Sequence, residues 1–396
     1  MKILMGLETF FPQMGGAELH VLRLAQAMRK RGHSVTIITA TPGPPLVHGL
    51  KVYRFPMLMS QGKKSTLALF FYLPMLFRLV HQHDVIHGHY TAMVSAVMGA
   101  LAKLLRRPFV VTLHGYGTLD SSVQKDRWLA LWRRLSITSA RRAICTSGEM
   151  ASVALRFLPP HQVVEIPNGV DTREFQPVSR ARDSLIRIGT VRRLVPKNGV
   201  QYLVEAAPLI VRRSPLPIEF IIAGEGVLRP YLERRVAELG LTQRFRFLGA
   251  LPNDRVSSVL QETDIVVFPS SAESTSLAAL EAMAMAKPIV ASAVGGYPEM
   301  VGGNERGLLV RLFDRAESDY NAPLTLPEDR LKLLAEAVLR LVSDEKLSLD
   351  LGRRARQYVS ERHDWDVLAC RIEPLYRSDD RGLGHNPVRR EPPAIP

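Results

Sequence analysis

The chain has 396 residues, of which 46% are hydrophobic and 23% are charged. This length suits two domains rather than one core, and the composition is that of a soluble globular protein. The two cysteines, Cys145 and Cys370, form no pattern, which predicts a reducing compartment and no disulfide. The opening Met-Lys-Ile-Leu-Met-Gly is too short for a secretion signal and indicates a strand. We therefore expect a cytoplasmic protein.

The net charge of +14 and the pI of about 10.0 suggest an anionic partner. Clustered Lys and Arg attract both membranes and nucleic acids, while a merely solvated basic surface is the plainer interpretation. No nucleic-acid motif or interleaved aromatic residues accompany the basic side chains. We therefore expect no nucleic acid partner. If the basic surface has an anionic partner, the favoured one is the inner face of an anionic membrane. The basic residues concentrate in the first half, at Lys103, Arg106, Arg107, Arg133, Arg134, Arg141 and Arg142.

The longest apolar run covers residues 66–77 and contains Pro74. It is too short to span a bilayer, which needs about 20 residues. A proline at this position is expected to kink a helix. A core helix is the default prediction, and an interfacial helix dipping into one leaflet is the alternative.

Strands and helices alternate along both halves of the chain. Residues 2–6 predict a strand, residues 15–31 a helix after a glycine pair, and residues 35–39 and 109–113 further buried strands. Such alternation predicts an α/β fold with a parallel, doubly wound sheet in each half. Ligands of such sheets bind beyond the carboxyl ends of the strands. Loops at those ends are therefore the first candidates for function.

The first candidate loop contains Gly15 and Gly16, between a strand and a helix. Glycines there let backbone N–H groups approach an anion closely, although a plain turn explains them equally well.

Histidines mark the ends of two later strands. His114 follows the strand at 109–113 and is expected to point toward a ligand, either a sugar or an acceptor; a turn histidine bonded to the backbone is the alternative. His87 and His89 are spaced as a metal pair, but no carboxylate or cysteine ligand set accompanies them, so we expect no metal. His89 is instead a candidate for the acceptor side.

In the second half, Arg192, Arg193 and Lys197 follow a strand at residues 185–191. Cations at the end of a strand suit a diphosphate, because they stabilise the charge that a departing nucleotide gains. A solvated basic loop is the alternative.

The stretch from Glu273 to Glu281 follows a buried strand and enters a segment rich in helix formers. The start of that helix offers N–H groups and a positive dipole end to phosphate, and Ser274, Thr275 and Ser276 are good cap residues. A nucleotide sugar, with hydroxyls on both sides of a diphosphate, fits this layout. A capped surface helix is the alternative.

Glu-x7-Glu, followed by Lys287-Pro288 and by Gly295-Gly296-Tyr-Pro-Glu299, resembles the donor-site signature of the retaining glycosyltransferases of family 4. Pro167-Asn-Gly-Val-Asp171 resembles the end of that family's N-terminal domain. Two departures stand out: Ser274-Thr275-Ser276 replaces the common Gly-Phe-Gly, and Asn198 stands where Lys commonly precedes Gly.

The resemblance covers residues 1–378 and implies the GT-B fold, in which two Rossmann-like domains face each other across a cleft. It places the acceptor-side domain at 1–176, the donor domain at 177–362 and a returning helix at 363–378. The Gly, Pro and charged residues of 379–396 predict a disordered tail. The resemblance further implies transfer of a sugar from a nucleotide diphosphate sugar to an acceptor hydroxyl, with retention of configuration and with neither a cofactor nor a metal. The basic first half and the apolar run favour a lipid-linked or membrane-bound acceptor.

The resemblance also assigns roles to residues. Glu273 is expected to hold hydroxyls of the donor sugar, Glu281 the ribose and His114 the sugar. Arg193 and Lys197 are expected to neutralise the diphosphate. The remaining donor-binding candidates are Gly15, Gly16, Arg192, Leu251, Thr275, Ser276 and Leu277. Two alternative functions remain: another GT-B enzyme, such as an epimerase or phosphorylase, and a non-catalytic membrane-associated scaffold.

Overall fold

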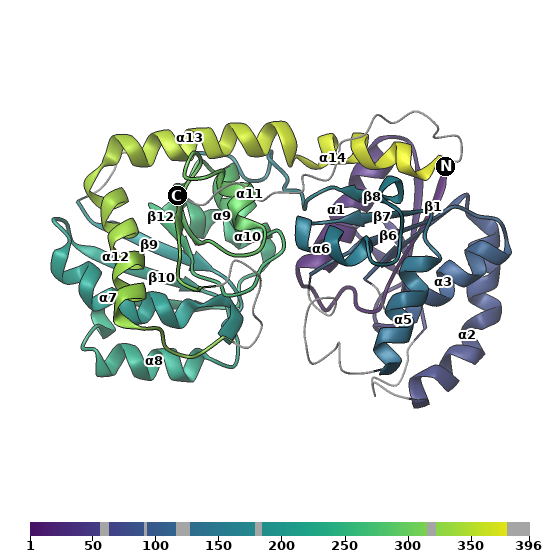
Figure 1. Cartoon of the computed structure of the whole chain (residues 1–396), viewed down its shortest axis with the longest axis horizontal. Helices are drawn as coiled ribbons and strands as arrows, with labels where there is room; N and C mark the ends of the chain where they lie inside the picture. Colours follow the sequence, from purple (N-terminus) through teal and green to yellow (C-terminus); the bar gives the residue numbers. More distant parts are fainter. Residues whose placement is uncertain (56–62, 91–92, 116–126, 179–183, 315–321, 378–396) are drawn as a thin grey trace. The chain divides into compact units, whose positions relative to one another are not determined.

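The computed structural model describes residues 1–55, 63–90, 93–115, 127–178, 184–314 and 322–377. These residues form two compact units, which Figure 1 shows with their elements labelled. Unit 1 holds Met1–Asn168 and the segment that begins at Trp365, and unit 2 holds Gly169–Asp364. The predicted boundary after residue 176 therefore lies within unit 2, and the predicted tail at 379–396 lies outside the described residues.

Unit 1 contains one eight-stranded sheet in the order β3-β4-β2-β1-β5-β6-β7-β8. All neighbours are parallel except β3 and β4, an antiparallel pair that the sequence did not predict. The central strands are buried over nearly their whole length, as expected for a sheet covered on both faces. The strands are β1 (Lys2–Leu7), β2 (Ser34–Thr39), β3 (Leu46–Val47), β4 (Leu50–Arg54), β5 (Val85–His89), β6 (Phe109–Leu113), β7 (Arg142–Cys145) and β8 (Val163–Glu165).

Helices cover both faces of this sheet. Helices α1 and α14 supply one core cluster, and α2, α3, α5 and α6 supply the other. Helix α2 runs through Pro74 without ending there. The helices are α1 (Gly16–Lys30), α2 (Lys63–Gln82), α3 (Met93–Leu104), α5 (Arg127–Thr138), α6 (Gly148–Ala154) and α14 (Trp365–Ile372).

Unit 2 contains a six-stranded, fully parallel sheet in the order β11-β10-β9-β12-β13-β14. Helices α7, α8 and α12 supply most of one core, and α9, α10, α11 and α13 supply the other. The strands are β9 (Ile186–Val191), β10 (Ile218–Ala223), β11 (Phe245–Gly249), β12 (Ile265–Phe268), β13 (Ile289–Ser292) and β14 (Leu308–Val310). The helices are α7 (Val200–Arg213), α8 (Arg229–Glu238), α9 (Asn253–Glu262), α10 (Leu277–Ala284), α11 (Tyr297–Val301), α12 (Glu328–Ser343) and α13 (Glu345–Arg362).

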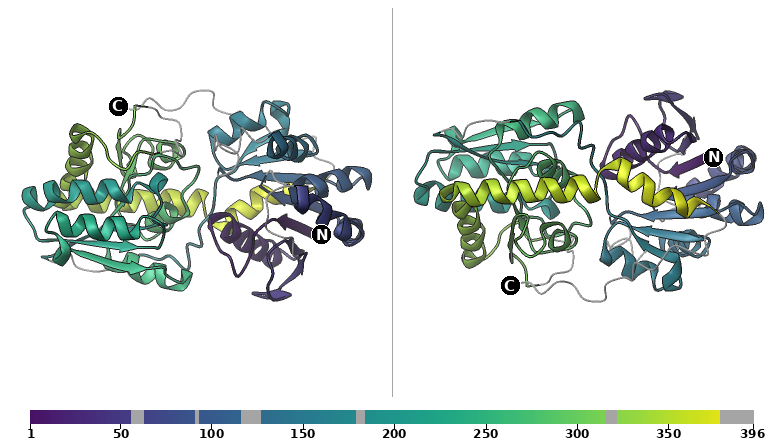
Figure 2. Two further views of the ribbon diagram at one scale, coloured as in Figure 1. Left: turned by 90° about the horizontal axis from the view of Figure 1, so that it is seen from below. Right: turned by 90° about the horizontal axis from the view of Figure 1, so that it is seen from above.

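The two sheets confirm the predicted doubly wound α/β architecture, and Figure 2 shows each with its helix layers. The chain order reverses between β1 and β5 in unit 1, and between β9 and β12 in unit 2. These are the switch points beyond which open α/β sheets bind ligands. Candidate site residues lie at these carboxyl ends: His89 ends β5 in unit 1, and in unit 2 Arg192 follows β9 and Glu273 follows β12.

The last described α-helix, α14, belongs to unit 1, although it follows α13 of unit 2 in the chain. Trp365, Leu368 and Ile372 are buried in the core cluster that contains α1. A short 3₁₀ helix, Glu373–Tyr376, follows, and the Tyr376 hydroxyl lies 2.7 Å from Nδ1 of His87. The end of the described chain is thus fastened to the central sheet of unit 1.

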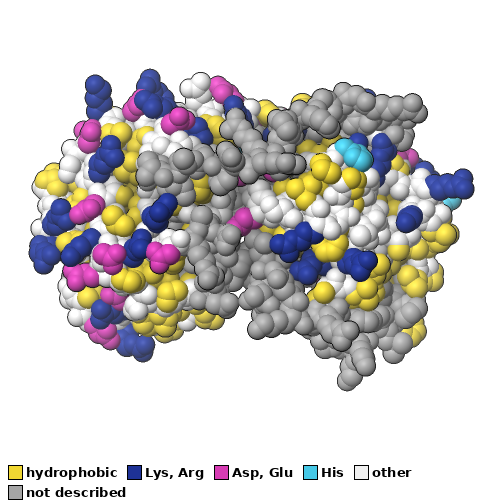
Figure 3. Space-filling view, in the orientation of Figure 1, with side chains coloured by type: hydrophobic (Ala, Val, Ile, Leu, Met, Phe, Trp, Pro, Cys, Tyr) yellow, Lys and Arg dark blue, Asp and Glu magenta, His cyan; other side chains and the backbone are white. Residues whose placement is uncertain are grey.

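Among the described residues, no helix combines the length and the hydropathy that a bilayer crossing needs. On the face seen in Figure 3, basic and acidic side chains intermingle over unit 2, whereas acidic side chains are sparse over unit 1.

Candidate functional site

The loops after β9 and β12 form a polar cluster at the switch point of unit 2. Arg192 follows β9 directly, and Glu273 lies in the loop between β12 and α10. The side chains are 6% and 14% exposed, and Nη2 of Arg192 donates to Oε2 of Glu273 in a buried ion pair. The sequence therefore brings two of its predicted site residues into direct contact.

Among the described residues, the Arg192 guanidinium donates hydrogen bonds to four side chains. Besides Glu273, it donates to Oγ of Ser270 and to the Tyr297 hydroxyl, each at 2.5 Å, and to Oδ1 of Asn198 at 3.3 Å. Burial alone lowers the pKa of Arg192, but Tyr297 and Glu273 raise it above the ordinary value. Arg192 is thus a fully charged group held in one orientation by buried partners, and it orients Glu273 in turn.

Asn198 occupies the position where a lysine was expected to precede glycine. Its side chain is buried, accepts from Arg192, and donates through Nδ2 to the Arg193 carbonyl at 2.7 Å. The charge that Asn198 lacks is therefore present beside it, on Arg192.

Two glycines let the loops of this cluster approach closely. Gly199 has φ +71°, and a Cβ there would lie 1.9 Å from the Pro269 carbonyl oxygen. A Cβ on Gly296 would lie 1.6 Å from the Ser274 carbonyl oxygen. Neither contact tolerates a side chain, so glycine at both positions sets the spacing of the loops.

The two other predicted cations differ in their surroundings. Arg193 is exposed, while Lys197 is partly buried and its backbone carbonyl accepts from the Ser271 amide at 2.9 Å. Burial lowers the pKa of Lys197; Glu273 opposes this shift, and Arg192 adds to it. Lys197 therefore lies within electrostatic reach of the Arg192–Glu273 pair.

Helix α10 begins where the sequence predicted it. Ser276 is its N-cap, with Oγ accepting from the Ala279 amide at 3.3 Å, while Thr275 is buried. Leu277 is the first helical residue and Glu281 is partly buried within the helix. The free N–H groups of the first turn and the adjacent cations make this end of unit 2 suited to a phosphate.

Leu251 lies in the loop after β11. It is partly buried against a small cluster of Ile221, Ala223 and Val259.

In unit 1, the glycine pair opens α1. Gly15 is the N-cap and Gly16 is the first helical residue. The Gly15 amide donates to Oε2 of Glu18 at 2.9 Å, and the Thr9 hydroxyl donates to Oε1 of the same carboxylate. An anion bound at the Gly15 amide would have to displace Glu18, a competition that the sequence did not predict.

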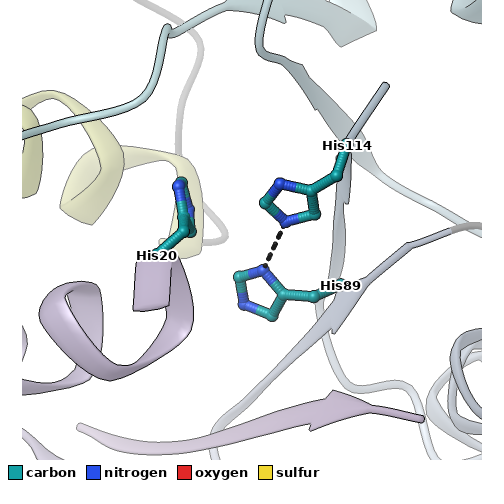
Figure 4. A group of neighbouring side chains, drawn as sticks. All are labelled: His20, His89 and His114. Atoms are coloured by element: carbon teal, nitrogen blue, oxygen red, sulfur yellow. Dashed lines mark hydrogen bonds between the residues drawn. The ribbon is translucent and has the colours of Figure 1, made fainter. Parts of the chain in front are cut away.

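The predicted site residue His114 lies in a cluster of buried histidines. Its Nε2 is 3.3 Å from Nδ1 of His89, and the His20 ring, from α1, packs against it with ring centroids 4.8 Å apart (Figure 4). His87 lies beneath them, with its two nitrogens 2.7 Å from the hydroxyls of Tyr376 and Thr112.

Comparison with known proteins relates most of the chain to one group of enzymes. Residues 14–174 match the family model described as Glycosyltransferase Family 4, and residues 186–344 match that of Glycosyl transferases group 1. The chain is 33% identical to a human phosphatidylinositol N-acetylglucosaminyltransferase subunit, over 95% of this chain and 75% of the relative. The Arabidopsis thaliana protein of the same name is 30% identical, over 97% and 82%.

The chain belongs to the family 4, group 1 glycosyltransferases.

Solved structures support the same fold. Anabaena HepE in complex with UDP superposes with a TM-score of 0.74 at 22% identity, over 94% of this chain and 99% of HepE. The sucrose-phosphate synthase of Thermosynechococcus elongatus has a TM-score of 0.74 at 24% identity, over 95% and 98%. This glycosyltransferase therefore has the predicted GT-B fold class, with two parallel-sheet α/β units.

Sequence reasoning missed several residues of this glycosyltransferase. Ser270 and Tyr297 hold Arg192, and His20 joins His89 and His114. Tyr297 lies in the predicted Gly-Gly-Tyr-Pro-Glu segment, so that motif was a signal for it. His20 had no comparable signal, because a single histidine on an amphipathic helix is indistinguishable from a core residue.

Proposed function

We propose that this glycosyltransferase moves a sugar from a uridine diphosphate sugar to an inositol-bearing acceptor, with retention of configuration. Membership of the family supports the transfer reaction. The observation that carries the assignment to these residues is the buried Arg192–Glu273 pair at the switch point of unit 2. It combines a phosphate-binding cation with a carboxylate that accepts hydrogen bonds from sugar hydroxyls.

The names of the relatives support the substrates. HepE was crystallised with UDP, and the human and Arabidopsis relatives are named as parts of a phosphatidylinositol N-acetylglucosaminyltransferase. A Corynebacterium urealyticum relative, 28% identical over 96% of this chain, is named D-inositol 3-phosphate glycosyltransferase. UDP-N-acetylglucosamine and an inositol phosphate or its lipid are therefore the first substrates to test.

In the proposed reaction, the bond from the sugar C1 to the diphosphate oxygen breaks, and a bond from C1 to the acceptor oxygen forms on the same face. The acceptor proton passes to an oxygen of the departing diphosphate. Arg193 and Lys197, with the α10 amides at Ser276 and Leu277, stabilise the charge of the leaving diphosphate. Glu273 orients the sugar, Glu281 holds the ribose and His114 contacts the sugar.

The first test is calorimetric binding of UDP, GDP, ADP and UDP-N-acetylglucosamine to the purified full chain. We expect a uridine preference that Glu281→Ala weakens at least about tenfold, the effect of one lost charge-assisted hydrogen bond. Glu262→Ala, on the exposed surface of α9, is the matched control. Equal binding of all three bases, or none, would overturn the donor assignment.

The second test follows the anomeric proton of the product by NMR. A retaining transferase gives product with the anomeric configuration of the donor from the first turnover. Inversion would refute the stereochemical part of the proposal while leaving the donor site intact. Release of free sugar without acceptor, or product only with added pyridoxal phosphate, would favour the alternative GT-B enzymes.

We further propose that unit 1 contacts an anionic membrane from the cytoplasmic side. Phe71 on α2 and Leu104 on α3 are 82% and 70% exposed, and basic residues accompany them in this unit. Vesicles containing phosphatidylserine should bind the wild type but not the double variant Phe71→Ser/Leu104→Ser. Leu349 is 67% exposed on α13, and the control variant Leu349→Ser should bind as the wild type does. Equal flotation of all three proteins would refute this contact.

A further inference from the structure

Three histidines converge in unit 1 from separate elements. His20 lies in α1, His89 ends β5 and His114 follows β6. One ring nitrogen of each lies within 4.8 Å of those of the other two. The side chains are 1%, 0% and 5% exposed, and Figure 4 shows the His20 ring beside the His89–His114 pair.

Two nitrogens of this cluster are unused by the protein. Nε2 of His20 and Nε2 of His89 are buried without a hydrogen-bond partner among the described residues. A buried polar atom without a partner is costly, and an imidazole lone pair can be satisfied by a metal ion. The cluster therefore contains unmet bonding capacity on His20 and on His89, and the other ring nitrogen of His89, Nδ1, is the one that faces His114.

The spacing matches a zinc coordination sphere. Two nitrogens at about 2.0–2.1 Å from one tetrahedral zinc ion lie about 3.3–3.4 Å apart. Nδ1 of His89 and Nε2 of His114 are 3.3 Å apart. A shift of about 1.4 Å closes the longest separation, 4.8 Å, to the same value.

We propose that unit 1 binds a zinc ion through His20, His89 and His114. Three histidines leave one coordination position open, as in catalytic rather than structural zinc sites. Since the three ligands are neutral, the bound ion keeps its charge, and its open position favours an anionic oxygen.

The surroundings fit a ligand set. Nδ1 of His20 lies 2.9 Å from Oδ1 of Asn168, the kind of second contact that orients a metal-bound imidazole. The Trp365 ring packs edge-on against His20, with centroids 4.9 Å apart. Burial lowers the pKa of all three imidazoles, so each is in its neutral, ligating form at pH 7.

This inference does not rest on the proposed function, because metal binding is measured without turnover. It adds one consequence: zinc on His114 removes that ring from the donor sugar. Zinc should therefore compete with sugar binding while leaving UDP binding unchanged.

The test is a cobalt titration of the full chain, freed of metal by a chelator and of any histidine tag. We expect one equivalent of Co²⁺ to give the visible absorption of a tetrahedral site, and Zn²⁺ to displace it. His20→Gln and His89→Gln should weaken Co²⁺ binding more than about 100-fold, and Asn168→Ala about 10- to 100-fold. His83→Gln is the matched control, since His83 is buried in the same unit with Nδ1 2.6 Å from the Leu79 carbonyl oxygen.

Circular dichroism and denaturant unfolding establish that each variant folds. X-ray absorption at the zinc edge of the wild type requires no variant and should show imidazole ligands without sulfur. The absence of a cobalt band, a sulfur ligand, or undiminished binding by folded His20→Gln and His89→Gln would overturn the proposal.

Discussion

Nη2 of Arg192 donates to Oε2 of Glu273 although the two residues are 81 positions apart in the chain. The contact exists because β9 and β12 are neighbours in the sheet, so that the loops at their carboxyl ends meet. It gives unit 2 a buried ion pair whose cation also bonds Asn198, Ser270 and Tyr297. The first two predictions test this network.

Arg192→Ala should lower the free energy of unfolding by about 3–5 kcal/mol, because it leaves Glu273 buried without its counter-charge. The double variant Arg192→Met/Glu273→Gln should lose less free energy of unfolding than Arg192→Ala, because it leaves no unpaired buried charge. Denaturant unfolding gives these values. Arg229→Ala, in an exposed pair with Glu225 and Glu233, is the control and should change stability little. A similar small loss for Arg192→Ala would contradict the structural role of the pair.

Asn198→Lys should destabilise unit 2 by about 1–3 kcal/mol, because it adds a second cation beside Arg192 and removes the bond to the Arg193 carbonyl. The double variant Asn198→Lys/Arg192→Ala should lose less stability than the sum of the two single losses, because the like-charge repulsion is absent and the new lysine lies near Glu273. A double-mutant cycle should therefore give a coupling energy above about 0.5 kcal/mol. Additive losses of stability would show that the side chains at positions 192 and 198 do not interact electrostatically.

Gly199→Ala should destabilise unit 2 well beyond the cost of its backbone conformation. Gly240 provides the comparison, because φ is +71° at Gly199 and +69° at Gly240, but no atom lies within 4 Å of a Cβ at Gly240. Gly240→Ala should cost about 1–2 kcal/mol from the left-handed conformation alone. Gly199→Ala adds a clash with the Pro269 carbonyl and should cost at least about 1–3 kcal/mol more in denaturant unfolding. Equal losses of stability in Gly199→Ala and Gly240→Ala would mean that the loop at Gly199 can move away from Pro269 without cost.

Glu8 should make stability fall as pH rises from about 4.5 to 7. Burial raises the pKa of Glu8 to about 7, against the hydrogen bond from the Val94 amide, which lowers it. Between these values the unfolded chain has lost this proton and the folded chain retains it, so rising pH favours unfolding. The contribution is fully present below pH 4.5 and lost above about 7. Glu8→Gln should flatten this part of the pH profile and stabilise the protein at pH 8, as measured by thermal unfolding. An unchanged slope would contradict the raised pKa.

Local patterns predicted the elements that carry the site. The apolar run before Pro269 indicated β12, and Ser276 followed by helix formers indicated the start of α10 within one residue. These features depend on hydrophobic period and capping, which neighbouring residues determine. The glycosyltransferase family could also be predicted from the sequence, because each of its motifs is a contiguous segment of the chain.

The tertiary structure alone decided which of these residues meet. Strand order places Arg192 against Glu273, and it brings His89 and His114 from adjacent strands to His20 on a helix. Periodicity tells which face of an element is buried, but not which other element will cover it. Partners 25 to 94 residues apart along the chain, as in the histidine cluster, are therefore fixed only by the packing of the whole unit.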